Sequence, residues 1–172
     1  MPLQIPKLSF QTCKIAEGTK GVEQTLRIMA RVVNETLLTK PDIRATALTI
    51  IKPVKDKDYR GEITAVYNWV KNNIRYTQDP WDKEMLQWPD YTLKLGQGDC
   101  DDHSILMASL LMSVGHECRF AVVQVARDSG NYDHVYAECK VNGDWVPVDT
   151  TNKSSGAMGW ETPHIKKAVM EL

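Results

Sequence analysis

The chain has 172 residues and a formal net charge of −1, and 42% of its residues are hydrophobic and 25% are charged. This length suits one domain with its own core, and this composition is typical of a soluble globular protein. The near-neutral charge predicts no partnership with nucleic acid or an anionic membrane surface. No apolar run approaches the roughly 20 residues that span a bilayer.

The cysteines and the N-terminus predict where the protein works. The four cysteines lie far apart and form no C-x-x-C pair, which argues against a disulfide framework and a structural zinc site. The first residues, Met1 to Lys7, lack the apolar stretch of a signal peptide. We therefore expect a cytoplasmic protein in a reducing environment.

The first half of the chain predicts an arm followed by helices. Residues 1–20 have no strong period and are expected to form an extended arm. Apolar residues at helical spacing then predict a helix from Val22 to about Leu38. A second helix is expected from Pro41 to about Ile51, since proline suits a first helical turn. A third helix has its apolar face at Ile63, Val66, Tyr67, Val70 and Ile74.

The segment from residue 76 to residue 98 has no clean period and is predicted to be a long loop that leads to Cys100. Loops of this length inside a compact domain are usually functional. For its aromatic residues the alternative is packing in the core. Gln87, Gln97 or a tyrosine or tryptophan of this loop could donate to an oxyanion, although the backbone N–H of Cys100 is the favoured donor. The residues expected to bind substrate here are Trp81, Trp88, Tyr91 and Gln97.

The second half of the chain predicts a helix from Cys100 to about Gly115 and then a small antiparallel sheet. Asn142-Gly143 is a strong signal for a two-residue hairpin turn. Residues 151–172 are expected to be a tail with a weak helical pattern, so the main domain spans residues 21–150. The fold class is α+β, with the N-terminal helices and the Cys100 helix packed on the sheet. Its expected strands are Arg119–Ala126, His134–Val141 and Asp144–Thr150.

Cys100 opens its helix, where unpaired backbone N–H groups and the helix dipole favour a thiolate. Asp99 is a natural N-cap, and Asp102 three residues later completes an arrangement like a capping box. Because both carboxylates oppose a thiolate, a base must supply much of the activation. The alternative for Cys100 is a buried structural cysteine.

The hairpin brings two further residues to the site. A two-residue turn places Val141 opposite Asp144, and counting back along both strands makes His134 and Asp149 diagonal neighbours on one face. An imidazole and a carboxylate can bridge such a separation of about 7–8 Å. Cys100, His134 and Asp149 are therefore a candidate triad for covalent catalysis.

His103 is a rival base, but its helix places no strand-borne acid beside it, and we expect it to serve in packing or hydrogen bonding. A metal site made of Cys100, Asp102, His103 and His134 matches no usual ligand set. We therefore expect no metal.

Three separated motifs occur in order along the chain. They are Gly98-Asp99-Cys100-Asp101-Asp102-His103 with its apolar helix, His134-Val135-Tyr136-Ala137-Glu138 and Trp145-Val146-Pro147-Val148-Asp149. Over about residues 40–150 the sequence resembles the transglutaminase-like superfamily of papain-related folds. The resemblance implies Cys100 as the nucleophile, His134 as the base and Asp149 as the residue that orients the base. The compact form resembles versions encoded by tailed phages and prophages.

These residues predict thiol-dependent acyl transfer on the amide bonds of a peptide or protein substrate, without a cofactor. Attack by water on the acyl-enzyme would make the chain a cysteine protease or amidase, and attack by an amine would make it a transglutaminase. The alternative is a phage virion or assembly protein that retains the fold, binds other virion proteins and is located in the virion. A further alternative is an interaction module whose aromatic loop binds peptide.

Overall fold

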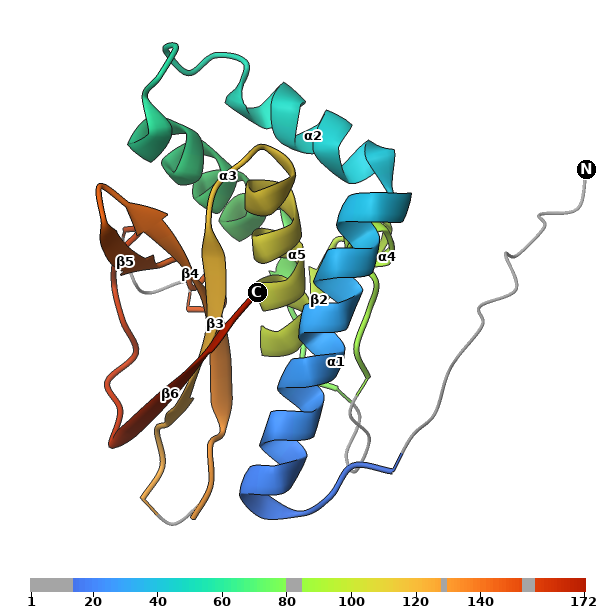
Figure 1. Cartoon of the computed structure of the whole chain (residues 1–172), viewed down its shortest axis with the longest axis vertical. Helices are drawn as coiled ribbons and strands as arrows, with labels where there is room; N and C mark the ends of the chain where they lie inside the picture. The colour runs from blue at the N-terminus through green and yellow to red at the C-terminus, as the bar shows by residue number, and fades with distance from the viewer. Residues whose placement is uncertain (1–13, 80–84, 128–129, 153–156) are drawn as a thin grey trace, which may run out of the picture.

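The computed structural model describes residues 14–79, 85–127, 130–152 and 157–172 (Figure 1). Helices dominate the first half of the chain and strands the second half. The helices are α1 (Gly18–Thr39), α2 (Pro41–Ile51), α3 (Tyr59–Asn73), α4 (Pro89–Leu95) and α5 (Cys100–Ser113). The strands are β1 (Arg75–Tyr76), β2 (Gln97–Gly98), β3 (Cys118–Gln124), β4 (His134–Val141), β5 (Asp144–Pro147) and β6 (Lys166–Glu171).

Helix α5 is the centre of the fold. All its residues from Asp101 to Leu111 are buried, as expected for a helix that is covered on every side. Strands β3 to β6 form an antiparallel sheet in the order β5-β4-β3-β6. Figure 1 shows α5 between this sheet and α1, with α2 and α3 closing the far end. The α+β architecture predicted from the sequence is confirmed.

The hairpin between β4 and β5 is confirmed in its turn and its register. Asn142 and Gly143 both have positive φ, 53° and 95°, as a type I′ turn requires. Val141 pairs with Asp144, and the pairing continues in step to Glu138 and Pro147. Beyond β5 the amide of Val148 still donates to the carbonyl of Ala137 at 2.9 Å, so the register extends toward Asp149.

Two sequence predictions are corrected by the fold. The long loop before Cys100 contains helix α4, which begins at Pro89 and ends at Leu95; Gly96 caps it in the left-handed conformation, φ 65°. Seven residues are too few for helical periodicity to be visible. The weak helical pattern predicted near the end of the tail is instead strand β6, which pairs with β3 and belongs to the sheet.

The N-terminal prediction is tested only in part. Helix α1 begins at Gly18, inside the predicted arm, and residues 1–13 lie outside the described residues.

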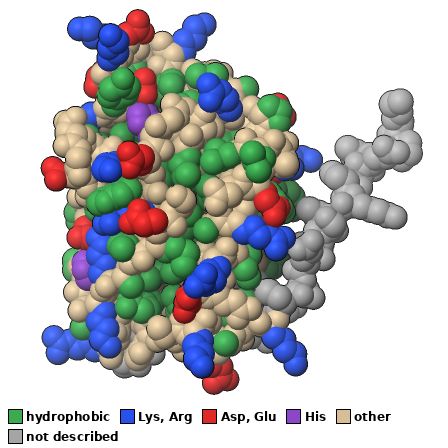
Figure 2. Space-filling view, in the orientation of Figure 1, with side chains coloured by type: hydrophobic (Ala, Val, Ile, Leu, Met, Phe, Trp, Pro, Cys, Tyr) green, Lys and Arg blue, Asp and Glu red, His purple; other side chains and the backbone are tan. Residues whose placement is uncertain are grey.

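On the face in Figure 2, acidic and basic side chains are intermixed around exposed hydrophobic ones. Among the described residues, no helix has the length and apolar character needed to cross a membrane.

Candidate active site

Cys100 is the first residue of α5, and a capping box holds the backbone around it. Oδ1 of Asp99 accepts hydrogen bonds from the amides of Asp101 and Asp102, at 3.1 and 3.2 Å. Oδ2 of Asp102 accepts in return from the amide of Asp99 at 3.3 Å. The half-buried Cys100 places its Sγ 3.7 Å from Oδ1 of Asp101. The predicted position of the thiol at the positive end of a helix is confirmed.

Asp102 links this helix start to the segment before α4. It is fully buried, and its Oδ1 accepts a hydrogen bond from the amide of Gln87 at 2.8 Å. Gly98 is required beside it, because a Cβ there would lie 2.5 Å from the Cβ of Asp102. Burial, with repulsion from Asp99, raises the pKa of Asp102 from 3.8 to about 7. A partly neutral Asp102 opposes the thiolate of Cys100 less than an ionised one would.

His134 and Asp149 meet as the register predicts. His134 opens β4, and its Nε2 lies 2.8 Å from Oδ2 of the buried Asp149. The other oxygen of Asp149 accepts from the amide and hydroxyl of Thr151, at 3.0 and 2.7 Å. Burial by itself raises the pKa of Asp149, but the hydrogen bonds from His134 and Thr151 outweigh it and leave the pKa below its usual value. An ionised Asp149 therefore accepts a hydrogen bond from Nε2 of His134 and holds the orientation of the imidazole ring.

The C-terminal segment contacts Asp149 and the tyrosine that lies beside His134. The hydroxyl of Thr162 donates to Oδ2 of Asp149 at 3.3 Å. The ring of Tyr136 packs beside the ring of His134, with centroids 5.9 Å apart, and its hydroxyl donates to Glu161 at 2.5 Å. Residues 157–172 thus complete the surroundings of the predicted triad.

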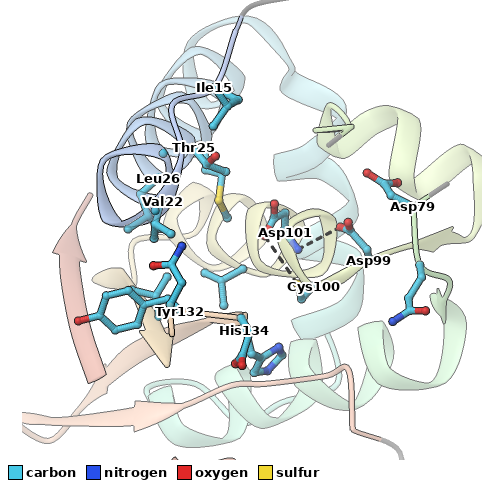
Figure 3. Close-up of a pocket in the computed structure, with 18 of the residues that line it drawn as sticks. Ile15, Val22, Thr25, Leu26, Asp79, Asp99, Cys100, Asp101, Tyr132 and His134 are labelled. Atoms are coloured by element: carbon cyan, nitrogen blue, oxygen red, sulfur yellow. Dashed lines mark hydrogen bonds between the residues drawn. The ribbon is translucent and has the colours of Figure 1, made fainter. Parts of the chain in front are cut away.

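Cys100 and His134 line one pocket with a volume of about 830 Å³. Figure 3 shows both residues in its middle, with α1 on one side and Asp79 on the other. Residues between Ile15 and Met29, from just before α1 to its middle, form one wall of this pocket, which we call the α1 wall. Sequence reasoning missed this part of the site. Leu26 belongs to the apolar stripe of this helix, but periodicity does not tell which part of the chain such a stripe contacts.

The predicted substrate-binding residues lie elsewhere or outside the described residues. Trp88, Tyr91 and Gln97 are absent from the pocket lining. Trp88 and Tyr91 lie at the start of α4, which packs on α5 with Pro89 and Thr92 buried. Trp88 instead has the ammonium of Lys40 5.7 Å from its ring centroid. The side-chain oxygen of Gln97 accepts from Arg75 at 2.5 Å. Trp81 is outside the described residues.

His103 does not line this pocket. It is buried, and its Nδ1 lies 2.8 Å from the hydroxyl of Thr150, which fits the packing and hydrogen-bonding role expected for it. Within the described ranges, no cluster of three or more His, Cys, Asp or Glu side chains is arranged to hold a metal ion.

Comparisons with known proteins agree with this geometry. Residues 44–150 match the family model described as the transglutaminase-like superfamily, whereas no curated protein sequence matches. The fold is similar to a candidate protease from Parabacteroides distasonis, with TM-score 0.59, 13% identity and coverage of 72% of this chain and 25% of that one.

Two further solved structures share the fold. A candidate cysteine protease from Cytophaga hutchinsonii matches with TM-score 0.53 and 13% identity, over 77% of this chain and 47% of that one. LapG from Legionella pneumophila matches with TM-score 0.50 and 15% identity, over 76% and 80%. The chain thus spans a quarter and about half of the first two structures. Since the family match covers most of the chain, including Cys100, His134 and Asp149, the chain belongs to the transglutaminase-like superfamily.

Proposed function

We propose that the chain is a thiol-dependent acyl-transfer enzyme that acts on amide bonds of a peptide or protein. The observation that carries this proposal is the 2.8 Å hydrogen bond between His134 and the buried Asp149, together with the position of His134 in the same pocket lining as Cys100. A thiol, an oriented imidazole and a buried carboxylate are the parts that covalent catalysis by cysteine needs. Membership of the transglutaminase-like superfamily supports the same reaction class.

In the proposed reaction His134 accepts the proton of the Cys100 thiol. Because Nε2 of His134 is engaged by Asp149, Nδ1 is the nitrogen assigned to this transfer. The thiolate attacks the amide carbonyl, and the backbone N–H of Cys100 donates to the oxyanion. When the tetrahedral intermediate collapses, the C–N bond breaks and His134 returns its proton to the leaving amine. A thioester remains, and attack by water or another amine releases the acyl group and restores the thiol.

The virion alternative is favoured by apolar residues in both terminal segments of the chain, which would pack on a partner chain. In the C-terminal segment Met158, Met170 and Leu172 pack against the chain's own core, whereas Ile165 and Val169 are exposed. In the N-terminal segment, residues 1–20, Ile15 lines the pocket of Cys100 and residues 1–13 lie outside the described residues. The enzyme remains the function that we propose.

Alkylation by iodoacetamide at pH 7, followed by peptide mass spectrometry, tests this proposal. We expect Cys100 to react faster than the buried Cys118 and Cys139, because Cys100 lines the same pocket as His134, whose imidazole can accept the thiol proton. His134→Ala should slow its alkylation about tenfold or more. His116→Ala is the matched control, because His116 hydrogen-bonds Glu62 and does not line the pocket. Equal rates at Cys100 in both variants would contradict the proposal.

A further inference from the structure

Helix α1 lies outside the part of the chain that matches the family model, residues 44–150, yet it forms one wall of the pocket that contains Cys100. Ile15 and Val22 present partly accessible apolar side chains to this pocket, and Leu26 and Met29 lie buried behind them. In Figure 3 Val22 and Leu26 on α1, with Ile15 just before the helix, lie across the pocket from the start of α5. The wall is therefore a feature of this chain in addition to the superfamily core.

Other elements extend the same apolar surface toward His134. Val122 on β3 and Val135 on β4 line the pocket, as does Tyr132 just before β4. The described part of the lining also contains four aspartates and no lysine or arginine; the aspartates are Asp79, Asp99, Asp101 and Asp133. An apolar group that enters this pocket buries surface against α1, whereas a carboxylate meets charges of its own sign.

We propose that the α1 wall binds the side chains of the acyl donor, so that the preferred substrate is a peptide with apolar residues immediately before the amide bond to be broken. Acidic residues at those positions are disfavoured. This inference rests on the proposed function, since it places the substrate carbonyl at Cys100. The pocket volume of about 830 Å³ is within the usual range of about 300–1,000 Å³ for small-molecule sites and has room for side chains of this size.

Three acetylated dipeptidyl chloromethyl ketones, with Leu-Leu, Ala-Ala or Glu-Glu sequences, test this preference on the full chain. In each labelling reaction the Cys100 sulfur forms a bond to the methylene carbon and chloride leaves. Each rate constant is divided by that for the same probe with glutathione, which removes intrinsic reactivity. We expect Leu-Leu to label at least about tenfold faster than Glu-Glu and several-fold faster than Ala-Ala, because apolar pockets discriminate by such factors.

Variants of α1 identify the wall as the cause. Val22→Asp should reduce the ratio of Leu-Leu to Ala-Ala labelling to near one, because it replaces an apolar lining side chain by a charged one. Leu38→Asp is the matched control on the same helix, at a position that is 85% exposed and outside the pocket; its ratio should equal that of the wild type. Thr25→Val, which replaces a lining hydroxyl by a methyl group, should raise the ratio.

The outcomes separate this inference from the function on which it rests. Equal normalised labelling by all three probes, with Cys100 still the fastest cysteine toward iodoacetamide, would overturn the apolar subsite alone. If Cys100 reacts with iodoacetamide no faster than Cys118 and Cys139, the proposed function is overturned. If circular dichroism shows that Val22→Asp is unfolded, Thr25→Val decides, and an unchanged ratio in that variant would refute the role of α1.

Discussion

Asp102 should make the stability of the protein fall as the pH rises through the range between about 4 and 7. Its pKa in the folded protein is about 7 against an ordinary value of 3.8, because it is buried and lies near Asp99. Between these values the folded state holds a proton that the unfolded state has released, so each rise in pH favours unfolding. Below pH 4 both states are protonated, and above pH 7 both are ionised.

The size of the effect follows from the two pKa values. A tenfold change in proton affinity between the two states corresponds to about 1.4 kcal/mol. The interval from 3.8 to about 7 therefore corresponds to at most about 4 kcal/mol of lost stability between pH 4 and pH 8. This is a large fraction of the 5–15 kcal/mol that is typical of a folded domain.

Asp102→Asn removes the titration and retains an oxygen that can accept from the amide of Gln87. The variant loses the second acceptor, which in the wild type receives a hydrogen bond from the amide of Asp99. This loss lowers the free energy of unfolding by an amount that does not depend on pH. Urea unfolding followed by tryptophan fluorescence at several pH values gives the free energy of unfolding of both proteins. We expect the wild type minus the variant to fall by several kcal/mol between pH 4 and pH 8. A difference that stays constant over this range would refute the reasoning.

Three further predictions concern the neighbours of these groups. Asp149→Asn should slow iodoacetamide alkylation of Cys100 at pH 7 by about 10–100-fold, since a hydrogen bond to a charged group contributes about 1.5–3 kcal/mol; an unchanged rate would show that Asp149 does not act through His134. Thr162→Val should slow the same alkylation several-fold and Thr162→Ser should restore it, whereas failure of serine to do so would exclude a role for the hydroxyl. Gly98→Ala should lower the free energy of unfolding by about 1–3 kcal/mol, because the added Cβ overlaps Asp102; thermal unfolding at the wild-type temperature would contradict this contact.

Features that depend on residues close together in the chain could be predicted from the sequence alone. The capping box at the start of α5 needs only Asp99 and Asp102 around Cys100. The hairpin is determined by the Asn142-Gly143 turn, and its strict alternation carries the register back toward His134. Such short-range preferences act in the same way whatever the rest of the chain does. The contact between His134 and Asp149 therefore follows from the turn and the alternation of the two strands that it joins.

Contacts between distant residues were decided only by the tertiary structure. Cys118 and Cys139 are direct partners across β3 and β4, and their hydrogen bond, with burial, raises the pKa of Cys118 well above its usual value. Nothing in the spacing of these cysteines indicates that they meet.

The α1 wall of the pocket and the hydrogen bond from Thr162 to Asp149 were likewise decided only by the tertiary structure. Both bring a segment outside residues 44–150 to the site. The apolar stripe of α1 predicts that this face will be buried, but hydrophobic attraction has no direction and does not select a partner. Strand β6 is too short to show its period against a helical alternative, and its pairing with β3 is made across more than 40 residues of chain. Whether these segments reach the active site depends on how all the layers pack together, which local patterns do not encode.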